Sequence, residues 1–399
     1  MAKLVIDDLD LKGKRVLVRV DFNVPLDDKL NVTDDTRIRA ALPTINRIIE
    51  SGGKVILMSH LGRPKGNIIE SMRLAPAGKR LSQLLNKEVT ILNDCTGEAV
   101  EAIVGAMKEG DVVVLENLRF YEGETKNGTE FAKRLSLLGD VYINDAFGTA
   151  HRAHASTEGV TKYFKQCAAG YLIQKELKYL GNAIENPQRP LAAILGGAKI
   201  SGKIDVIENL LGKVDALLIG GGMAYTFFKA QGINIGNSLL EKDKVELARK
   251  VLEQAKVKNI DFFLPHDNLI AEQISDTTEV KETTGPAVPD GWLGVDIGRQ
   301  TIKKFTEVIK NANTIIWNGP MGIFEQEKFS NGTIAIAKAL ANQTEAGAIS
   351  VVGGGDSVAA LVKAKLTANI THVSTGGGAS LEFLGGIKLP GIEALTDKQ

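Results

Sequence analysis

The sequence predicts an α/β protein with parallel sheets and two domains. Short apolar segments, too short for buried helices, alternate with longer segments whose apolar residues recur every three or four positions. Strands that alternate with helices in this way form parallel sheets. The chain has 399 residues, and a single hydrophobic core rarely serves a chain of this length. We therefore expect two domains, each with its own sheet.

Composition excludes several classes of protein. Hydrophobic residues make up 44% of the chain and charged residues 24%, as in ordinary globular proteins. Lysine plus arginine equals aspartate plus glutamate at 48 each, so we expect neither nucleic acid nor a membrane surface as partner. Cys95 and Cys167 are too few and too far apart to indicate a disulfide framework or a zinc site. The first residues, MAKLVIDDLD, lack the apolar segment of a signal peptide, and we expect a cytoplasmic protein.

Polar residues follow each predicted strand of the first half. The strands are expected at 16–20, 54–58, 112–115 and 141–143, with helices between them such as 36–50 and 76–85. Ligands bind at the carboxyl ends of parallel strands, where this sequence places Asp21, Asn23, His60, Arg63, Arg119 and Arg152. Eleven of the 14 arginines lie in the first 152 residues. Because guanidinium groups bind carboxylate and phosphate, the first half is predicted to hold an acidic ligand.

A helical pattern over residues 171–184, followed by Pro187 and Pro190, is interpreted as the linker between the domains. Glycine then marks the strand ends of the second half. The predicted strands lie in the segments LAAILGG, ALLIGGGMAYTFF, FFLPHD, TIIWNGPMG, ISVVGGGDS and HVSTGGGAS. The glycine clusters 220–222, 353–355 and 376–378 come where strands give way to helices. Their backbone N–H groups could therefore contact phosphates or a flat base.

The segment 191–204, LAAILGGAKISGKI, predicts a phosphate-binding turn. We expect a helix to begin close behind the two glycines, and Lys199 and Lys203, four residues apart, to share one face beside its start. Residues 197–203 match the GxxxxGK part of a P-loop, but Ile204 stands where a P-loop has the Ser or Thr that binds magnesium. A P-loop NTPase is therefore disfavoured. Tight strand-to-helix packing would explain the glycines equally well.

Eight motifs in one order resemble phosphoglycerate kinase: RVDFNVP (19–25), SHLGRP (59–64), ENLRF (116–120), AFGTAHRAH (146–154), GGAKISGK (196–203), WNGPMGIFE (317–325), GGGDS (353–357) and STGGGAS (374–380). The resemblance implies two Rossmann-like domains that face a cleft, each a parallel sheet covered by helices on both faces. It implies that residues 1–170, with 389–399 returning, bind 3-phosphoglycerate or 1,3-bisphosphoglycerate. Residues 171–186 would form the linker helix, and residues 187–388 would bind ATP or ADP with Mg²⁺. The implied reaction is reversible, direct in-line phosphoryl transfer. Because the two sets of residues lie in different halves of the chain, we expect hinge closure about the linker, and we expect a two-lobed single chain to be a monomer.

The resemblance also implies the site residues. Substrate would be bound by Asp21, Phe22, Asn23, Arg37, His60, Leu61, Gly62, Arg63, Arg119 and Arg152. The transferring phosphoryl group would be stabilised by Arg37, Lys199, Gly376 and Gly377. The nucleotide would be bound by Lys203, Gly220, Gly221, Gly294, Asn318, Glu325, Gly354, Gly355, Asp356 and Ser357, with Asp356 also serving the metal. The terminal oxygen of ADP is already ionised at neutral pH, which agrees with a chain that offers cations and glycines but no Ser-His-Asp arrangement.

Structural roles stay open for several of these residues. Asp21 could cap a turn, His60 could be a hydrogen-bonded core residue, and Asp356 could cap a helix. Arg37 could form an ion pair with Asp34 or Asp35, and Arg39 is expected to be structural. His151 and His154 lack a third ligand nearby, so we interpret them as hydrogen-bonding residues and not as metal ligands.

The sequence gives less support to two other functions. A nicotinamide-dependent dehydrogenase shares the fold class, but the chain has no GxGxxG after a strand. A two-lobed solute-binding protein would also have hinged α/β halves, but it should carry an export signal.

Overall fold

The computed structural model describes residues 3–398. It divides into two compact units: the first holds the chain up to Leu177 and from Lys388 onwards, and the second holds Lys178–Ile387. The division falls inside the segment that we interpreted as the linker. That segment is helical throughout, but a π-helical turn, η6 (Leu177–Gly181), separates α6 (Tyr171–Glu176) from α7 (Asn182–Glu185).

The first unit contains a six-stranded parallel sheet in the order β3-β4-β2-β1-β5-β6. Its strands are β1 (Arg15–Val20), β2 (Lys54–Met58), β3 (Thr90–Ile91), β4 (Val112–Val114), β5 (Val141–Asp145) and β6 (Cys167–Ala169). The four strands predicted for the first half are confirmed. Consecutive residues from Val16 to Val20 are all buried, so both faces of the sheet are covered, as in other parallel sheets.

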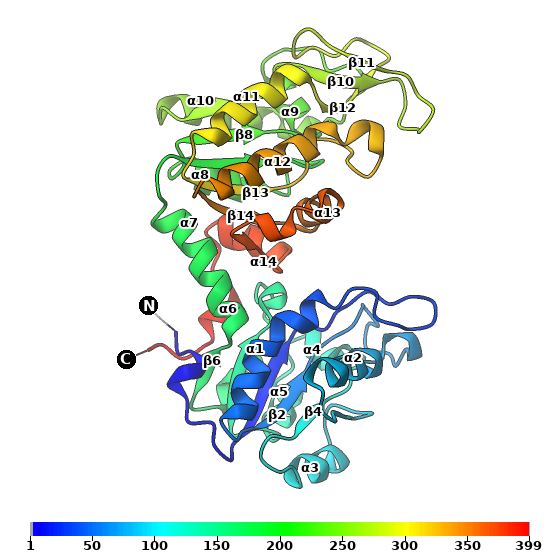
Figure 1. The fold of residues 1–399 in the computed structure, drawn as a ribbon, viewed down its shortest axis with the longest axis vertical. Helices are drawn as coiled ribbons and strands as arrows, with labels where there is room; N and C mark the ends of the chain where they lie inside the picture. Colours follow the sequence, from blue (N-terminus) through cyan, green and yellow to red (C-terminus); the bar gives the residue numbers. More distant parts are fainter. Residues whose placement is uncertain (1–2, 399) are drawn as a thin grey trace. The chain divides into compact units, whose positions relative to one another are not determined.

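Helices of the first unit cover this sheet (Figure 1). They are α1 (Thr36–Glu50), α2 (Ala75–Leu85), α3 (Glu98–Gly105), α4 (Glu122–Thr125), α5 (Thr129–Ser136), α6 and α15 (Pro390–Glu393), with short 3₁₀ turns at Ile6–Asp8, Glu70–Met72, Leu118–Phe120, Phe147–Thr149 and Gly159–Tyr163. Ile38, Ile45 and Ile48 recur at helical spacing on α1 and are fully buried against the sheet. This amphipathic pattern is why α1 and α2 could be predicted.

The segment from Lys388 belongs to the first unit. The backbone N–H of Leu4 donates to the carbonyl of Thr396 at 2.7 Å, and the N–H of Thr396 donates to the carbonyl of Cys167 on β6 at 3.0 Å. The side chain of Asn144 on β5 donates to the carbonyl of Gly391 at 2.9 Å. Residues from both ends of the chain thus share the β5–β6 edge of one sheet (Figure 1).

The second unit contains another six-stranded parallel sheet, in the order β15-β14-β13-β7-β8-β9. Its strands are β7 (Leu191–Leu195), β8 (Ala216–Ile219), β9 (Asp261–Phe263), β13 (Thr314–Asn318), β14 (Ile349–Gly353) and β15 (His372–Val373). Each lies in a segment predicted to form a strand. Trp317 at the centre is fully buried and packs with Ile194, Phe305 and Leu340, so this unit has a core of its own.

The helices of the second unit are α7, α8 (Ile204–Leu210), α9 (Met223–Ala230), α10 (Val245–Val257), α11 (Arg299–Lys310), α12 (Asn331–Glu345), α13 (Gly355–Ala364) and α14 (Gly378–Leu384), with 3₁₀ turns at Lys242–Lys244, Glu327–Phe329 and Thr367–Asn369. In the part of the chain that the structure describes, no helix combines the length and the apolar character needed to cross a membrane.

A small antiparallel sheet of order β11-β10-β12 was not predicted. Its strands are β10 (Asn268–Ala271), β11 (Val280–Glu282) and β12 (Leu293–Ile297). Two of the three strands have four residues or fewer, and β11 is exposed throughout. Such strands carry almost no alternating apolar pattern, which is the signal that sequence reasoning depends on.

Candidate active site

Loops at the carboxyl ends of β1, β2 and β4 contact one another in the first unit. Gly62, after β2, donates its N–H to Oδ1 of Asn23, after β1, at 2.9 Å. The carbonyl of Gly62 accepts from Nη1 of Arg119, after β4, at 2.8 Å. Gly62 has φ +65°, and a Cβ there would lie 2.8 Å from Sδ of Met72, so glycine is favoured at this junction. The structure therefore brings these predicted residues together.

A cavity of about 450 Å³ lies beside this junction, lined by Arg63, Lys65, Gly66, Arg119, Glu122, Thr125, Lys126 and Arg152. Five of these side chains are cationic and one is a carboxylate. Arg119 is buried, and its Nε has no hydrogen-bond partner among the described residues. Burial, together with Arg19 and Arg152, lowers the pKa of Arg119 to about 10, which leaves it charged at neutral pH. A buried charged donor without a partner is what an anion-binding site requires.

Arg37 forms its ion pair with Asp21, and not with Asp34 or Asp35. Its Nη1 lies 2.7 Å from Oδ2 of Asp21. Asp21 also accepts the N–H of Asn23 through Oδ1 at 3.2 Å, so it caps a turn and holds an arginine at the same time. Arg39 instead pairs with Asp35 at 2.8 Å.

His60 is buried, and its Nδ1 lies 3.1 Å from Nη2 of Arg19. A guanidinium group can only donate, so Nδ1 accepts this bond and the proton of the neutral ring lies on Nε2. Burial, and then the charges of Arg19 and Arg119, hold the pKa of His60 well below its usual value. His60 is therefore a neutral N–H donor at physiological pH.

Arg19 was not predicted as a site residue. It is fully buried and donates from Nε to Oγ of Ser156 at 2.8 Å, and that hydroxyl donates to Oε1 of the buried Glu124 at 2.6 Å. His154 lies 3.7 Å from the same carboxylate, and burial, together with the nearby arginines, lowers its pKa to about 4. Arg19 stands in the RVDFNVP motif, but its central place in this network depends on residues more than 100 positions away.

Some predicted residues offer no side chain to a ligand. Phe22 is fully buried and its N–H donates to Oγ of Ser59 at 2.8 Å. Leu61 is also buried, and its N–H donates to Oδ1 of Asn117 at 3.2 Å. Both residues shape the backbone of the site loops.

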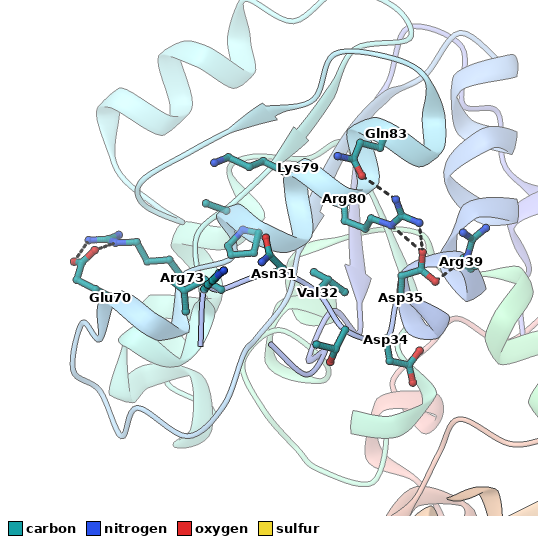
Figure 2. A pocket seen from close by; sticks show the side chains of 15 residues that line it. Asn31, Val32, Asp34, Asp35, Arg39, Glu70, Arg73, Lys79, Arg80 and Gln83 are labelled. Carbon is teal, nitrogen blue, oxygen red and sulfur yellow. Dashed lines mark hydrogen bonds and ion pairs between the residues drawn. The ribbon is translucent and has the colours of Figure 1, made fainter. Parts of the chain in front are cut away.

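A larger cavity of about 890 Å³ lies between the loop at residues 29–35 and α2 (Figure 2). None of the predicted site residues lines it. Its arginines are already paired: Arg39 and Arg80 with Asp35, and Arg73 with Glu70. Because each of these arginines already has a carboxylate partner, we do not assign a ligand to this cavity.

The prediction for Lys199 and Lys203 was wrong in its geometry. α8 begins only at Ile204, so neither lysine lies within it and the two do not share a helical face; residues 197–203 are bends and turns, except for Lys199. The N–H groups of Gly196 and Gly197 donate to the carbonyls of Asn318 and Pro320 at 3.0 and 2.8 Å, and Gly197 has φ +100°. These groups are thus bound to the end of β13, and the positive φ of Gly197 is not a helical conformation.

Lys203 is half-buried in the second unit, beside Asn318. Its Nζ donates to the Asn318 carbonyl at 3.2 Å and also to Oδ1 of that side chain. Burial lowers the pKa of Lys203 to about 8, although Asp356 acts in the opposite direction. Nδ2 of Asn318 is buried without a hydrogen-bond partner among the described residues, and a Cβ at Gly354 would lie 3.0 Å from it. Lys203, Asn318 and the start of α13 therefore form one polar cluster.

The second unit has a cavity of about 490 Å³, and four of the residues predicted to bind nucleotide line it: Gly221, Gly294, Glu325 and Asp356. A Cβ at Gly294 would lie 1.6 Å from Oη of Tyr225, so no larger residue fits in this wall. Gly220 does not line the cavity; a Cβ there would lie 2.4 Å from Sδ of Met321. Gly222, the last residue of the predicted cluster 220–222, also lines the cavity. The other lining residues were not predicted: Gly197, Ala198, Tyr225, Asn237, Leu239, Ile274, Leu293, Val295, Asp296, Pro320, Met321, Gly322 and Ile323.

The last two glycine clusters precede helices, as predicted. α13 begins at Gly355, and Ser357 within it accepts the N–H of Gly319 at 2.6 Å. α14 begins at Gly378, after Gly377 with φ +49°. The N–H of Gly376 donates to Oγ of Ser374 at 3.1 Å, so this group already has a partner.

Asp356 is exposed in the first turn of α13, and the preceding Gly354 is the N-cap residue. Asp356 is therefore not the cap of its helix. Among the described residues no group of three or more His, Cys, Asp or Glu side chains could hold a metal ion. One exposed carboxylate on the cavity wall fits a Mg²⁺ ion that takes its remaining ligands from phosphate oxygens and water.

Comparisons with known proteins agree on one family. A model of the phosphoglycerate kinase family matches residues 6–387. A phosphoglycerate kinase of Chloroherpeton thalassium is 59% identical over 397 residues, which cover 100% of both chains. One of Synechococcus elongatus is 56% identical over 388 residues, covering 97% of this chain and 96% of that one. The solved phosphoglycerate kinase from Coxiella burnetii superposes with a TM-score of 0.89 at 44% identity, covering 98% of each chain.

Proposed function

The chain belongs to the phosphoglycerate kinase family, and we propose that its first unit binds the phosphoglycerate and its second unit the nucleotide. The protein catalyses reversible phosphoryl transfer between 1,3-bisphosphoglycerate and ADP, which gives 3-phosphoglycerate and ATP, in glycolysis and gluconeogenesis. The observation that supports assigning the two ligands to different units is the cationic cavity of the first unit. There the buried Nε of Arg119 has no hydrogen-bond partner among the described residues.

In this proposal Arg63, Arg119 and Arg152 bind the phosphate that is not transferred, since all three line the cationic cavity. His60 adds a neutral Nε2–H donor. Asp21 and Asn23 hold the hydroxyl and carboxyl end of the substrate. Each charged group thus acts on an anion or a polar oxygen, and no general base is needed.

Arg37, Lys199 and the backbone at Gly376 and Gly377 are proposed to stabilise the phosphoryl group during direct in-line transfer. Asp21 holds the guanidinium of Arg37 in place before the substrate arrives. A donor that is already oriented needs little reorganisation free energy to interact with the charge of the transition state.

On the nucleotide side, the base is proposed to enter the 490 Å³ cavity, against the backbone of Gly221 and Gly294, with Glu325 on the ribose. Gly220 supports this wall from behind. Lys203, Asn318, Gly354, Gly355 and Ser357 are proposed to surround the phosphates. Asp356 is proposed to bind Mg²⁺, which when present would neutralise charge on the phosphate oxygens.

We expect the protein to become more compact when both ligands are bound. The two proposed residue sets belong to different units, so direct transfer requires the units to approach each other. Small-angle scattering should show a smaller radius of gyration with 3-phosphoglycerate plus a non-hydrolysable Mg-ATP analogue than with either ligand alone. An unchanged radius with both ligands bound would contradict hinge closure.

The affinity for Mg-ATP should fall at alkaline pH because Lys203 loses its proton with a pKa of about 8 in the free enzyme. Its charge is present below that pH and is lost above it. At saturating 3-phosphoglycerate, kcat/KM for Mg-ATP should therefore decrease as pH rises through about 8. Lys203→Arg keeps a charge throughout this range and should remove this decrease. If both profiles decrease together, Lys203 is not the titrating group.

We further propose that the protein acts as a monomer in the cytoplasm. A single chain provides both proposed residue sets, so no second subunit is needed to complete the site.

A further inference from the structure

The turn at residues 196–203, which carries Lys199 and Lys203, is held firmly at its base. Gly196 and Gly197 are bound to the end of β13, and the N–H of Met223 donates to the Gly197 carbonyl at 3.0 Å. A Cβ at Gly222 would lie 2.9 Å from the carbonyl of Ala198. Lys199 comes directly after this packed base, and both Lys199 and Ser201 are exposed. Ile200, between them, is fully buried and anchors the backbone there, so a further restraint on the exposed residues of this turn has to come from outside it.

Glu241 provides that restraint from a loop 40 residues away in sequence. Its Oε1 accepts the hydroxyl of Ser201 at 2.5 Å, and its Oε2 accepts the N–H of Ser201 at 3.1 Å. Burial alone would raise the pKa of Glu241, but the bonds from Ser201 and Ile200, with the charge of Lys199, hold it below the usual value. Glu241 is thus an ionised acceptor for two donors on the same residue, and charge-assisted bonds of this kind are strong.

The loop that carries Glu241 is itself connected to the nucleotide cavity. Asn237 and Leu239, on the same loop, line that cavity. The N–H of Glu241 lies 3.4 Å from Oγ1 of Thr226, which is buried in α9. One short loop therefore contacts both the proposed base site and the lysine turn.

We propose that Glu241 is a positioning residue for phosphoryl transfer. It holds the turn at residues 196–203 so that Lys199 reaches the transferring group. The contact between Glu241 and Ser201 also couples the conformation of this turn to the loop that lines the 490 Å³ cavity. Glu241 contacts neither substrate nor phosphate and acts through Ser201. This inference rests on the role of Lys199 given under the proposed function.

A double-mutant cycle between Glu241 and Lys199 tests the inference. Glu241→Ala should lower kcat about tenfold, because small displacements of a charged catalytic group are costly. In a Lys199→Ala background the same change should have less than about a twofold effect, since the group that it positions is already absent. The affinity for 3-phosphoglycerate, measured by calorimetry without nucleotide, should stay unchanged.

Glu246→Ala is the matched control, because Glu246 is an exposed glutamate nearby whose carboxylate pairs with Arg249 at 2.6 Å. It should leave kcat unchanged. Should Glu241→Ala fail to fold, Ser201→Ala replaces it in the cycle, since it removes the 2.5 Å bond from an exposed residue.

The outcomes separate two failures. Equal losses of kcat from Glu241→Ala in the wild-type and Lys199→Ala backgrounds would overturn the positioning role. A Lys199→Ala variant with unchanged kcat would instead refute the proposed role of Lys199 itself, and the positioning role with it.

Discussion

Replacing Arg37 with alanine should lower kcat by about 10³-fold or more, the range measured for arginines that stabilise a transferring phosphoryl group. The structure gives a reason for such a large effect. Arg37 is held at 2.7 Å from Asp21, so its charge is oriented without the cost of ordering a free side chain. Steady-state rates at saturating concentrations of both substrates measure the loss, and thermal unfolding should show little change in stability.

Arg39→Ala provides the matched control for Arg37. Arg39 lies on the same helix, its side chain is 55% exposed, and it pairs with Asp35. A surface ion pair of this kind contributes about 0–1 kcal/mol, so this variant should keep its kcat. Asp21→Asn removes the ion pair but keeps Arg37, so it separates the effect of the ion pair on kcat from the effect of the arginine. A loss of tenfold or less in Arg37→Ala would make Arg37 a positioning residue and would transfer the main electrostatic role to Lys199.

Lys203→Ala should weaken nucleotide binding by about 10- to 100-fold and leave 3-phosphoglycerate binding nearly unchanged. A hydrogen bond to a charged group contributes about 1.5–3 kcal/mol, and this lysine is partly withdrawn from water, where competition with solvent is weaker. Calorimetric titration with each ligand separately measures both affinities. The variant also leaves the Asn318 side chain without its lysine donor, so some of the loss will come from reorganisation of that side chain.

Lys242→Ala is the control for Lys203, because Lys242 is an exposed lysine in the same unit. It should change neither affinity. Equal losses of nucleotide and 3-phosphoglycerate affinity in Lys203→Ala would contradict the assignment of the two ligands to different units.

Local patterns in the sequence predicted the two parallel sheets and α1 because each depends on spacing within one short segment. Buried strands such as β4 and β7 are continuous apolar runs, and α1 repeats its apolar residues at 38, 45 and 48. Polar residues at strand ends were also visible in the sequence, because strand ends of a parallel sheet share one edge. Asn23, Gly62 and Arg119 could therefore be expected near one another before any contact was known.

The remaining features depend on contacts between distant segments. The backbone at Gly197 is not helical, with φ +100°, and the N–H groups of Gly196 and Gly197 donate to Asn318 and Pro320, more than 100 residues away. Arg37 has acidic neighbours in sequence at Asp34 and Asp35, yet the helix directs it to Asp21. Leu239 and Ile274 line the 490 Å³ cavity from loops with no recognisable motif. No local pattern predicts such contacts.

The return of the C-terminal segment to the first unit has a consequence for the order of folding during synthesis. Residues 178–387 form the second unit without interruption, so that unit can fold as soon as its own segment has been made. The first unit is synthesised earlier, but Leu4, Cys167 and Asn144 find their backbone partners at Thr396 and Gly391 only later. Contacts so distant in sequence form slowly. The unit whose synthesis starts first is therefore the one that is completed last.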